Sequence, residues 1–335
     1  MTPTWAIVMT AREPAALVVA NARWHLATGA SEAHVYLDRA DDPAAAMLAA
    51  LPGCRVTVCD DAHWSAMRGR KGRPDSQMRR QSLNANHAQA RSDAGWMLHL
   101  DADEFLWQDR PLADELALVS ELGAELRFPV LERTMRHGET QNTLFAGRFR
   151  RVSPSAAGIN RVIYGDKARF LRDGMFSHGS GKCAVPVRHG FHHYVHESVI
   201  DVDGKRVRPP SFRSTAARLL HFDGLTPLHW LVKILRYRRN PPDVQRQILP
   251  DHRFAQIDWA LDRIADLPSA LAAHAALLWM TEAEETRLRG FGLIDDRAFD
   301  PAPMLGDLAP ALAPAAFDAA LRAMEPELFA LTGWT

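Results

Sequence analysis

Apolar and polar positions divide the first part of the chain into short blocks. Residues 5–10 form a compact apolar run bounded by polar residues, and similar runs occur at 33–38 and 55–59. The first two runs are followed by segments at 15–28 and 43–51 whose composition suits helices, and Pro14 stands where a first helical turn tolerates proline. Strand, helix, strand, helix, strand in this order predicts right-handed βαβ units and a parallel sheet.

The pattern continues with a basic loop, a polar helix and a fourth strand. Residues 67–74 are rich in glycine, arginine and lysine, which predicts a mobile loop. A helix is expected over 76–91, and its polar face carries Gln77, Arg80, Asn84 and His87. The apolar run that begins at Trp96 predicts the fourth strand. The fold class that follows is α/β, with a Rossmann-like, mostly parallel sheet flanked by helices.

The second half of the chain differs in pattern from the first. Residues 125–207 are strand-rich and irregular, and helical periodicity returns at 227–239. After the pair Pro241-Pro242 the chain is mainly helical, over 254–290 and 314–331, with apolar stripes at helical spacing. We therefore predict an α/β catalytic domain over 1–240 and a helical C-terminal region over 241–335 packed on it.

Composition excludes several classes of protein. Lysine plus arginine and aspartate plus glutamate both number 40 in the 335 residues, so no global basic field favours nucleic acid as a partner. The three cysteines form no CxxC motif, and the N-terminus has no signal-peptide pattern. No apolar run reaches the length of a membrane span. We expect a cytoplasmic protein without a transmembrane segment.

The fourth strand delivers acidic residues at its end. Asp101 and Asp103 are spaced i and i+2, which places side chains on the same side of a strand, and Glu104 follows directly. Such oxygen ligands suit a Mg²⁺ or Mn²⁺ that also holds phosphate oxygens, and the metal would neutralise a leaving diphosphate as a Lewis acid. The alternative is that Asp-x-Asp is a solvated turn or helix cap. Asp38 also falls at a strand end, where phosphate-bearing ligands bind in open α/β sheets.

A histidine and a lysine extend this set. His221 lies in the apolar, strand-like run 219–223, where an imidazole could complete a metal shell begun by Asp103. Most of the histidines between His178 and His196 are expected to be structural or exposed, because their spacing fits no zinc motif. Lys182 is expected on a small flexible loop, where it could reach diphosphate or acceptor oxygens or could remain a solvated surface lysine. The basic loop at 68–73 could be a phosphate lid, but a solvated loop is the safer interpretation.

Four segments in order resemble the bacterial glycosyltransferase family 2-like proteins with a Leu-Asp-Ala-Asp-Glu-Phe strand end. These share the GT-A fold and are related to the family 92 glycosyltransferases. The likeness covers about residues 4–240, and Arg12 departs from it by replacing the asparagine of the usual Lys-Asn-Glu. The segments are Thr10-Ala-Arg12-Glu13 with Trp24-His25-Leu-x-x-Gly29, then Val35-Tyr36-Leu37-Asp38, then His99-Leu-Asp101-Ala-Asp103-Glu104-Phe105-Leu, then Leu220-His221-Phe222-Asp223 leading to Trp230-Leu-Val-Lys233-Ile-Leu-Arg236-Tyr237.

The resemblance implies a role for each matching residue. Asp38 would contact the nucleotide base or ribose, and Arg12 stands at a position for the same contact. Asp101 would bind the ribose, or the metal through water. Asp103 would bind the metal directly, and His221 would close the metal site. Lys182 resembles the lysine of a Gly-Lys-Ser position, and Glu104 would orient the site.

The reaction implied is metal-dependent transfer of a sugar, with Mn²⁺ or Mg²⁺, from a nucleotide-diphosphate sugar to an acceptor hydroxyl. Inversion would need a general base, for which the candidates are Asp173, Asp166, Glu132 and Glu197. The acceptor would be a carbohydrate, a lipid-linked molecule or another hydroxyl compound in surface polysaccharide or glycoconjugate synthesis, with peripheral membrane contact open. Two alternatives remain: a nucleotidyl- or phosphotransferase using the same carboxylate–metal site, and a catalytically degenerate nucleotide-sugar-binding protein.

Overall fold

The chain passes repeatedly between two units. The structure, a computed structural model, describes residues 2–154, 158–238, 249–263 and 265–332. The first unit comprises Met1–Val130, Ser180–Leu219 and Pro301–Leu308, and the second comprises Leu131–Gly179, Leu220–Asp300 and Ala309–Thr335. The boundary predicted between 240 and 241 lies outside the described residues, so the division into 1–240 and 241–335 stays a prediction.

A seven-stranded sheet organises the first unit. Strands β3, β2, β1 and β4 pair in parallel in that order, which is the 3-2-1-4 order of doubly wound folds. The sheet then continues through antiparallel β9 to β6 and parallel β13. The strands are β1 Trp5–Ala11, β2 Glu32–Leu37, β3 Cys54–Val58, β4 Trp96–His99, β6 Glu125–Phe128, β9 Lys182–Pro186 and β13 Ser211–Arg213.

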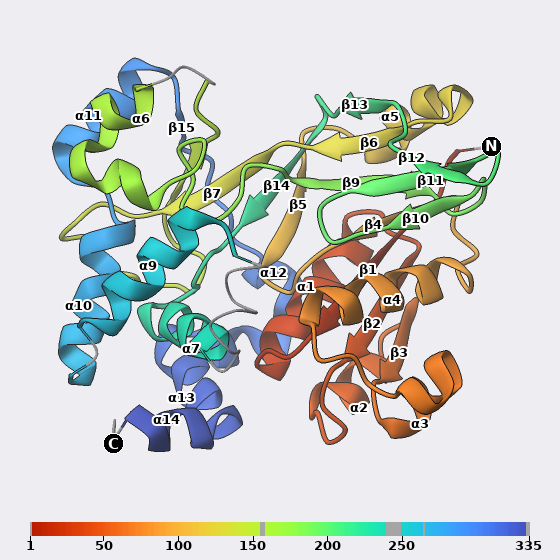
Figure 1. Cartoon of the computed structure of the whole chain (residues 1–335), viewed down its shortest axis with the longest axis horizontal. Coiled ribbons are helices and arrows are strands. Elements are labelled where there is room, and N and C mark those ends of the chain that lie inside the picture. Colours follow the sequence, from red (N-terminus) through yellow and green to blue (C-terminus); the bar gives the residue numbers. More distant parts are fainter. Residues whose placement is uncertain (1, 155–157, 239–248, 264, 333–335) are drawn as a thin grey trace. The chain divides into compact units, whose positions relative to one another are not determined.

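Helices flank this sheet, and Figure 1 shows α1 (Ala15–Ala27) and α4 (Gln77–Gln89) beside its parallel strands. Side chains of β1, β2 and β4, such as Val8, Tyr36 and Met97, form a buried apolar cluster with residues of α4. The predicted α/β fold with a mostly parallel, Rossmann-like sheet flanked by helices is confirmed, and it is consistent with a GT-A-like fold. The remaining helices of this unit are α2 Ala44–Ala49, α3 Asp61–Arg68, η1 Gly69–Lys71, α5 Leu112–Val119, η2 Ser120–Leu122 and α12 Ala302–Leu305.

Two smaller β structures complete the first unit. Strands β10 (Phe191–His193), β11 (Ser198–Val202) and β12 (Lys205–Val207) form an antiparallel sheet. Strand β5 (Glu104–Gln108) follows the fourth strand closely and lies beside β14 (Ala217–His221), along which the chain passes into the second unit.

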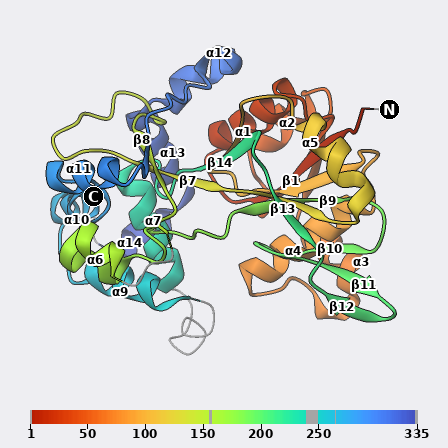
Figure 2. The same ribbon diagram turned by 90° about the horizontal axis from the view of Figure 1, so that it is seen from above.

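The second unit is mainly helical. Figure 2 shows α7 (Pro227–Arg238), α9 (Asp251–Leu261) and α10 (Leu267–Leu278) gathered together, and Trp230, Ile257 and Leu277 from these helices belong to one buried apolar cluster. Strands β7 Val130–Thr134, β8 Arg148–Arg151 and β15 Ile294–Asp295 pair antiparallel. The other helices are α6 Ile159–Tyr164, η3 Gly165–Phe170, α11 Glu282–Gly290, η4 Gly306–Leu312, α13 Pro314–Met324 and α14 Pro326–Thr332, with η4 beginning in the first unit.

The expected loop at 67–74 proved partly helical. Helix α3 extends to Arg68, and a 3₁₀ turn occupies Gly69–Lys71. The helix begins where the Asp60 carboxylate accepts a hydrogen bond of 2.8 Å from the His63 N–H, a capping signal that the basic composition of the segment obscured. Among the described residues no single helix has the length and apolar character to cross a membrane, although the bent pair Ala302–Leu312 and Pro314–Met324 passes that test together.

Candidate functional site

The acidic motif lies in a turn between β4 and β5. Strand β4 ends at His99, and the Glu104 N–H donates to the Asp101 carbonyl at 3.0 Å, which closes a turn over Asp101, Ala102 and Asp103. The strand alternation from which we expected the two aspartates to converge therefore does not apply. Their convergence on one metal ion stays a prediction.

Asn21 holds this turn from helix α1. Its fully buried amide Nδ2 donates to the Glu104 carbonyl at 2.7 Å and to the Ala102 carbonyl at 3.1 Å. On the other side, the Glu104 carboxylate Oε2 accepts the Asp101 N–H at 2.8 Å. The backbone of the turn is thus fixed by two side chains, Asn21 and Glu104. That Glu104 also orients a metal site stays a prediction. Asparagine inside a helix gives no sequence signal for this contact.

The next turn of α1 holds strand β5 in the same way. The Trp24 indole N–H donates to the Leu106 carbonyl at 3.1 Å, and His25 Nε2 accepts the Leu106 N–H at 3.1 Å. His25 Nδ1 lies 2.8 Å from the Asn21 carbonyl and donates to it. Burial lowers the pKa of His25 to about 4, so the ring is neutral with its proton on Nδ1.

The Asp101 carboxylate accepts hydrogen bonds from two side chains. Its Oδ1 accepts from the Gln81 amide at 2.5 Å, and its Oδ2 accepts from the Lys182 ammonium at 2.9 Å. Burial alone would raise the pKa of the Asp101 carboxyl, but the Lys182 charge outweighs it and holds that pKa below its usual range. The pKa of Lys182 is lowered by burial and raised more strongly by Asp101 and Glu104, and the net result is a raised value. Both groups stay charged.

Lys182 does not lie on a flexible loop, and that prediction is wrong. It is the first residue of strand β9, its side chain is 1% exposed, and its Nζ also lies 3.4 Å from Glu104 Oε2. Gly181 allows the chain to enter strand β9 at this point, because its φ is +70° and a Cβ there would collide with the Phe128 carbonyl oxygen. The small residues that suggested flexibility instead allow close packing.

Asp38 follows strand β2 and is paired with two arginines. Its Oδ2 lies 2.8 Å from the Arg73 guanidinium and 3.0 Å from that of Arg80. Arg73 comes from the basic segment after α3, so that segment is tied to the end of the sheet. Arg12 follows the parallel strand β1 and is partly buried, and Asp103 is buried in its turn. Arg12, Asp38 and the acidic turn thus follow the ends of β1, β2 and β4, whereas Lys182 begins β9.

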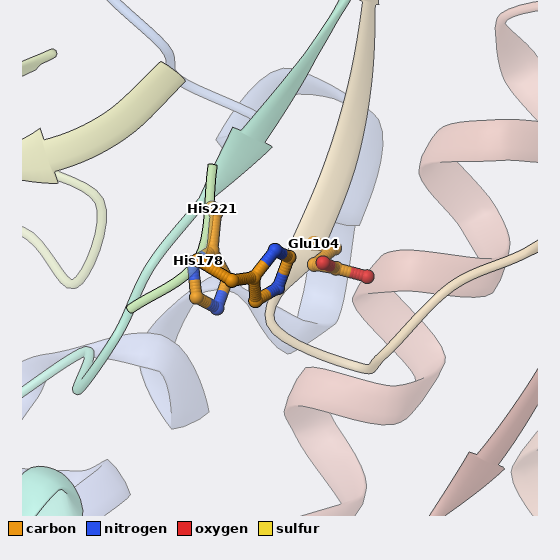
Figure 3. A group of neighbouring side chains, drawn as sticks. All are labelled: Glu104, His178 and His221. Atoms are coloured by element: carbon orange, nitrogen blue, oxygen red, sulfur yellow. The ribbon is translucent and has the colours of Figure 1, made fainter. Parts of the chain in front are cut away.

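His221 ends strand β14 in the second unit and belongs to a hydrogen-bonded chain there. Its Nδ1 lies 2.9 Å from Ser177 Oγ, and Ser177 Oγ donates to Glu132 Oε1 at 2.6 Å. The His178 ring lies beside it, with ring centroids 5.1 Å apart. Figure 3 shows the two imidazoles, and it also draws Glu104, which belongs to the first unit.

The base candidates lie in different settings. Glu132 is 1% exposed and ion-paired to Arg150 at 3.0 Å, so its carboxylate is enclosed in the interior of the second unit. Asp166 is exposed in η3, and Asp173 is exposed beside Arg172. Glu197 is exposed in the β10–β11 connection of the first unit and pairs with Arg208. None of these placements singles out a base.

The donor types suit a divalent cation. Asp103 and Glu104 in the first unit carry carboxylate oxygens, and His178 and His221 in the second carry imidazole nitrogens. Carboxylate oxygens suit Mg²⁺ or Mn²⁺ and imidazole nitrogens suit transition metals, and their combination at one ion stays a prediction. The sequence proposed Asp38, Asp101, Asp103, Lys182 and His221 as site residues and named the segment containing Arg73, but it gave no sign of the contacts made by Asn21, Gln81 or Ser177.

The chain matches no protein-family model and none of the curated proteins. Among solved structures, it is similar to TarS 1–349 of S. aureus in complex with UDP (11% identity, 98% of this chain and 92% of that chain, TM-score 0.36). It is also similar to HddC of Yersinia pseudotuberculosis (10% identity, 65% of this chain and 93% of that chain, TM-score 0.33). A third similar structure is glucosyl-3-phosphoglycerate synthase of Mycobacterium tuberculosis in complex with Mn²⁺, UDP and glucosyl-3-phosphoglycerate (16% identity, 55% of this chain and 57% of that chain, TM-score 0.27).

Proposed function

We propose that the protein is a metal-dependent glycosyltransferase that takes a sugar from a nucleotide-diphosphate sugar. The observation that carries this proposal is the acidic turn Asp101–Glu104 at the carboxyl end of β4, fixed by Asn21 and Lys182. A doubly wound sheet binds phosphate-bearing ligands beyond the carboxyl ends of its strands. A rigid set of carboxylates there is suited to a cation that accompanies a diphosphate.

Charge around the turn supports a diphosphate ligand. Lys182 carries a buried positive charge next to Asp101, and Arg73 and Arg80 surround the Asp38 carboxylate. Each carboxylate is thus accompanied by cations, so the edge of the sheet is not simply acidic. Guanidinium and ammonium groups bind phosphate oxygens, and we expect them to act on the donor after it enters.

The residues divide the work of binding the donor. Asp101 has both oxygens engaged by Lys182 and Gln81, which suits contact with the ribose, or with the metal through water. Asp103 is the proposed direct ligand of Mn²⁺ or Mg²⁺, and His221 is the proposed imidazole ligand. Asp38 and Arg12 would contact the base or ribose. When bound, the cation would neutralise charge on the departing nucleoside diphosphate.

We further propose inversion at the sugar carbon and a hydroxyl acceptor in a surface polysaccharide or glycoconjugate. Glu132 is excluded as the base, because its carboxylate accepts three hydrogen bonds and forms an ion pair with Arg150 in the interior of the second unit. Asp166, Asp173 and Glu197 remain candidates, since each is exposed to solvent. A general base has to reach the acceptor hydroxyl directly or through one water.

The test is calorimetric binding of UDP and GDP, each with and without Mn²⁺. We expect Mn²⁺-dependent binding of one nucleotide, weakened about tenfold or more by Asp103→Asn, because an amide is a poorer metal ligand than a carboxylate. Asp93→Asn is the matched control, since Asp93 precedes β4 at its opposite end and its side chain is 84% exposed.

Binding of neither nucleotide would contradict the proposal, whereas binding without turnover would favour the degenerate nucleotide-sugar-binding protein. Turnover separates the enzymes: a glycosyltransferase releases nucleoside diphosphate and a transferred sugar. Pyrophosphate among the products would instead identify a nucleotidyltransferase.

A further inference from the structure

The second unit contains a buried carboxylate, Glu132, for which the proposed donor contacts give no role. Glu132 lies in β7 and Arg150 in β8, and both side chains are 1% exposed with 3.0 Å between Arg150 Nη2 and Glu132 Oε2. Glu132 also accepts the Phe176 N–H at 3.1 Å and the Ser177 N–H at 2.7 Å. Arg150 forms an ion pair with Glu132 and the two backbone N–H groups donate to it, so its carboxylate acts as an acceptor toward these neighbours.

The Ser177 hydroxyl connects this carboxylate to His221. A serine hydroxyl has one hydrogen to donate, and at 2.6 Å from Glu132 Oε1 that hydrogen points to the carboxylate. The hydroxyl oxygen is therefore an acceptor toward His221 Nδ1, 2.9 Å away. His221 Nδ1 must carry a proton, and in the neutral ring the lone pair is then on Nε2.

We propose that Glu132 and Ser177 are positioning residues that fix His221 in the Nδ1–H tautomer, the form whose Nε2 can bind a divalent cation. Histidines that bind metals commonly donate the other ring N–H to a carboxylate or another acceptor, which sets the tautomer and the ring orientation. Here the acceptor is a hydroxyl backed by a carboxylate. The cation part of this inference rests on the proposed function, and the tautomer does not.

The 176–177 segment is itself held in place. The His252 Nε2–H of α9 donates to the Ser177 carbonyl at 2.9 Å, and the Gln256 amide donates to the Phe176 carbonyl at 2.6 Å. The Arg150 guanidinium lies over the Phe176 ring, 4.7 Å from its centroid. Ser177 therefore presents its hydroxyl from a backbone that is fixed on both sides, as a positioning role requires.

The tautomer is measured directly by long-range ¹H–¹⁵N NMR on the full-length, metal-free protein at about pH 8, where an ordinary histidine is neutral. His221 is assigned by the signal that disappears in His221→Gln. We expect the Nδ1–H pattern in the wild type and in Ser177→Thr, which keeps the hydroxyl. Ser177→Ala should lose the pure Nδ1–H pattern.

Ser198→Ala is the matched control, because Ser198 is a buried serine that donates to a buried carboxylate, Glu125, at 2.6 Å in the first unit. It should leave the His221 signal unchanged. An Nε2–H pattern for His221 in the wild type would overturn the proposal whatever the protein binds. An Nδ1–H pattern that persists in Ser177→Ala would overturn the role of the Glu132–Ser177 pair.

A titration with Mn²⁺ alone, followed by electron paramagnetic resonance, tests the connection to the cation. Loss of such a supporting contact typically costs ten- to a hundredfold in metal affinity, so we expect at least about a tenfold loss in Ser177→Ala. Ser177→Thr should recover most of it, and Ser198→Ala should match the wild type. Equal affinity in Ser177→Ala would overturn the link between tautomer and cation. No Mn²⁺ binding in the wild type, with the Nδ1–H tautomer intact, would refute the proposed function and leave the tautomer assignment standing.

Discussion

Two buried ion pairs, one in each unit, use similar groups in different ways. In the first unit, Lys182 pairs with Asp101, whose side chain keeps 28% of its surface exposed. In the second, Arg150 pairs with Glu132, and neither side chain has more than 1% exposed. A carboxylate that reaches solvent can exchange its partner for a ligand, whereas an enclosed one can act only through the groups that contact it. The chemistry of a charged pair therefore indicates less about its role than the access that the surrounding residues leave it.

Removal of each buried cation should give the largest effects. Arg150→Met leaves the enclosed Glu132 carboxylate without its partner, which costs about 3–5 kcal/mol of unfolding free energy, and Lys182→Met should cost less because the Asp101 side chain is 28% exposed. In Lys182→Met the deficit should shrink as the pH falls toward about 4, because burial then raises the pKa of Asp101 and protonation removes the unpaired charge. Urea denaturation at several pH values measures both effects.

Lys205→Met is the control, since Lys205 lies exposed on β12 and its replacement should change stability by less than about 0.5 kcal/mol. A loss below about 1 kcal/mol in both variants, Lys182→Met and Arg150→Met, would show that neither ion pair contributes to stability as expected of a buried pair. A loss of unfolding free energy in only one of the two variants would identify the unit whose stability depends on its ion pair.

Acid should destabilise the protein through its neutral buried histidines, which occur in both units. Burial lowers the pKa of His25 and His99 to about 4, and that of His193 and His274 to about 3. Between about pH 6.5 and 4 the unfolded chain binds protons that the folded chain does not, so stability falls as the pH falls. Each such histidine contributes a slope of about 1.4 kcal/mol per pH unit.

Replacement of one histidine should make that slope shallower. In His25→Gln the unfolding free energy between about pH 6 and 4.5 should vary less with pH, by about 1.4 kcal/mol per unit. His189→Asn is the control, because His189 is exposed and asparagine tolerates its φ of +87°. An unchanged slope in His25→Gln would mean that His25 binds a proton in the folded state.

Asn21→Leu should give a smaller loss of stability and a separate loss of binding. The carbonyls of Ala102 and Glu104 lose a buried donor, which costs about 1–3 kcal/mol, and the acidic turn loses its support. Mn²⁺-dependent nucleotide affinity should fall with it. Asn86→Leu provides the comparison, because Asn86 also bonds a backbone, that of His193, but outside the turn. Equal nucleotide affinity in the two variants would remove Asn21 from the site.

The sequence predicted the sheet well because hydrophobic pattern and strand position are local properties. The strands ending near Thr10, Leu37 and His99 and the helix after Pro14 all appear within one or two residues of the expected bounds. The positions of Asp38 and Asp101 beyond strand ends followed from the same pattern. Helix α3 was missed because its start depends on one cap, Asp60, and its last two residues, Met67 and Arg68, lie in the segment 67–74 for which a loop was expected.

The contacts that support the site were not predictable from the sequence, because they join residues far apart in the chain. Asn21 meets Glu104 across 83 positions, and Lys182 meets Asp101 across 81. Ser177 looked like part of a flexible run, yet it joins two side chains 44 or 45 positions away. Pattern analysis locates elements, but the partner of a buried polar side chain is fixed only after those elements pack.

Gly181 has a consequence for selection experiments. In a library randomised at positions 181 and 182 and selected only for folding, position 181 should return glycine, because every other side chain would meet the Phe128 carbonyl. Gly123 also has positive φ, but nothing lies near its absent side chain, so asparagine should survive there. An invariant glycine beside the lysine would therefore record the space available to the backbone, and it would carry no information about the reaction.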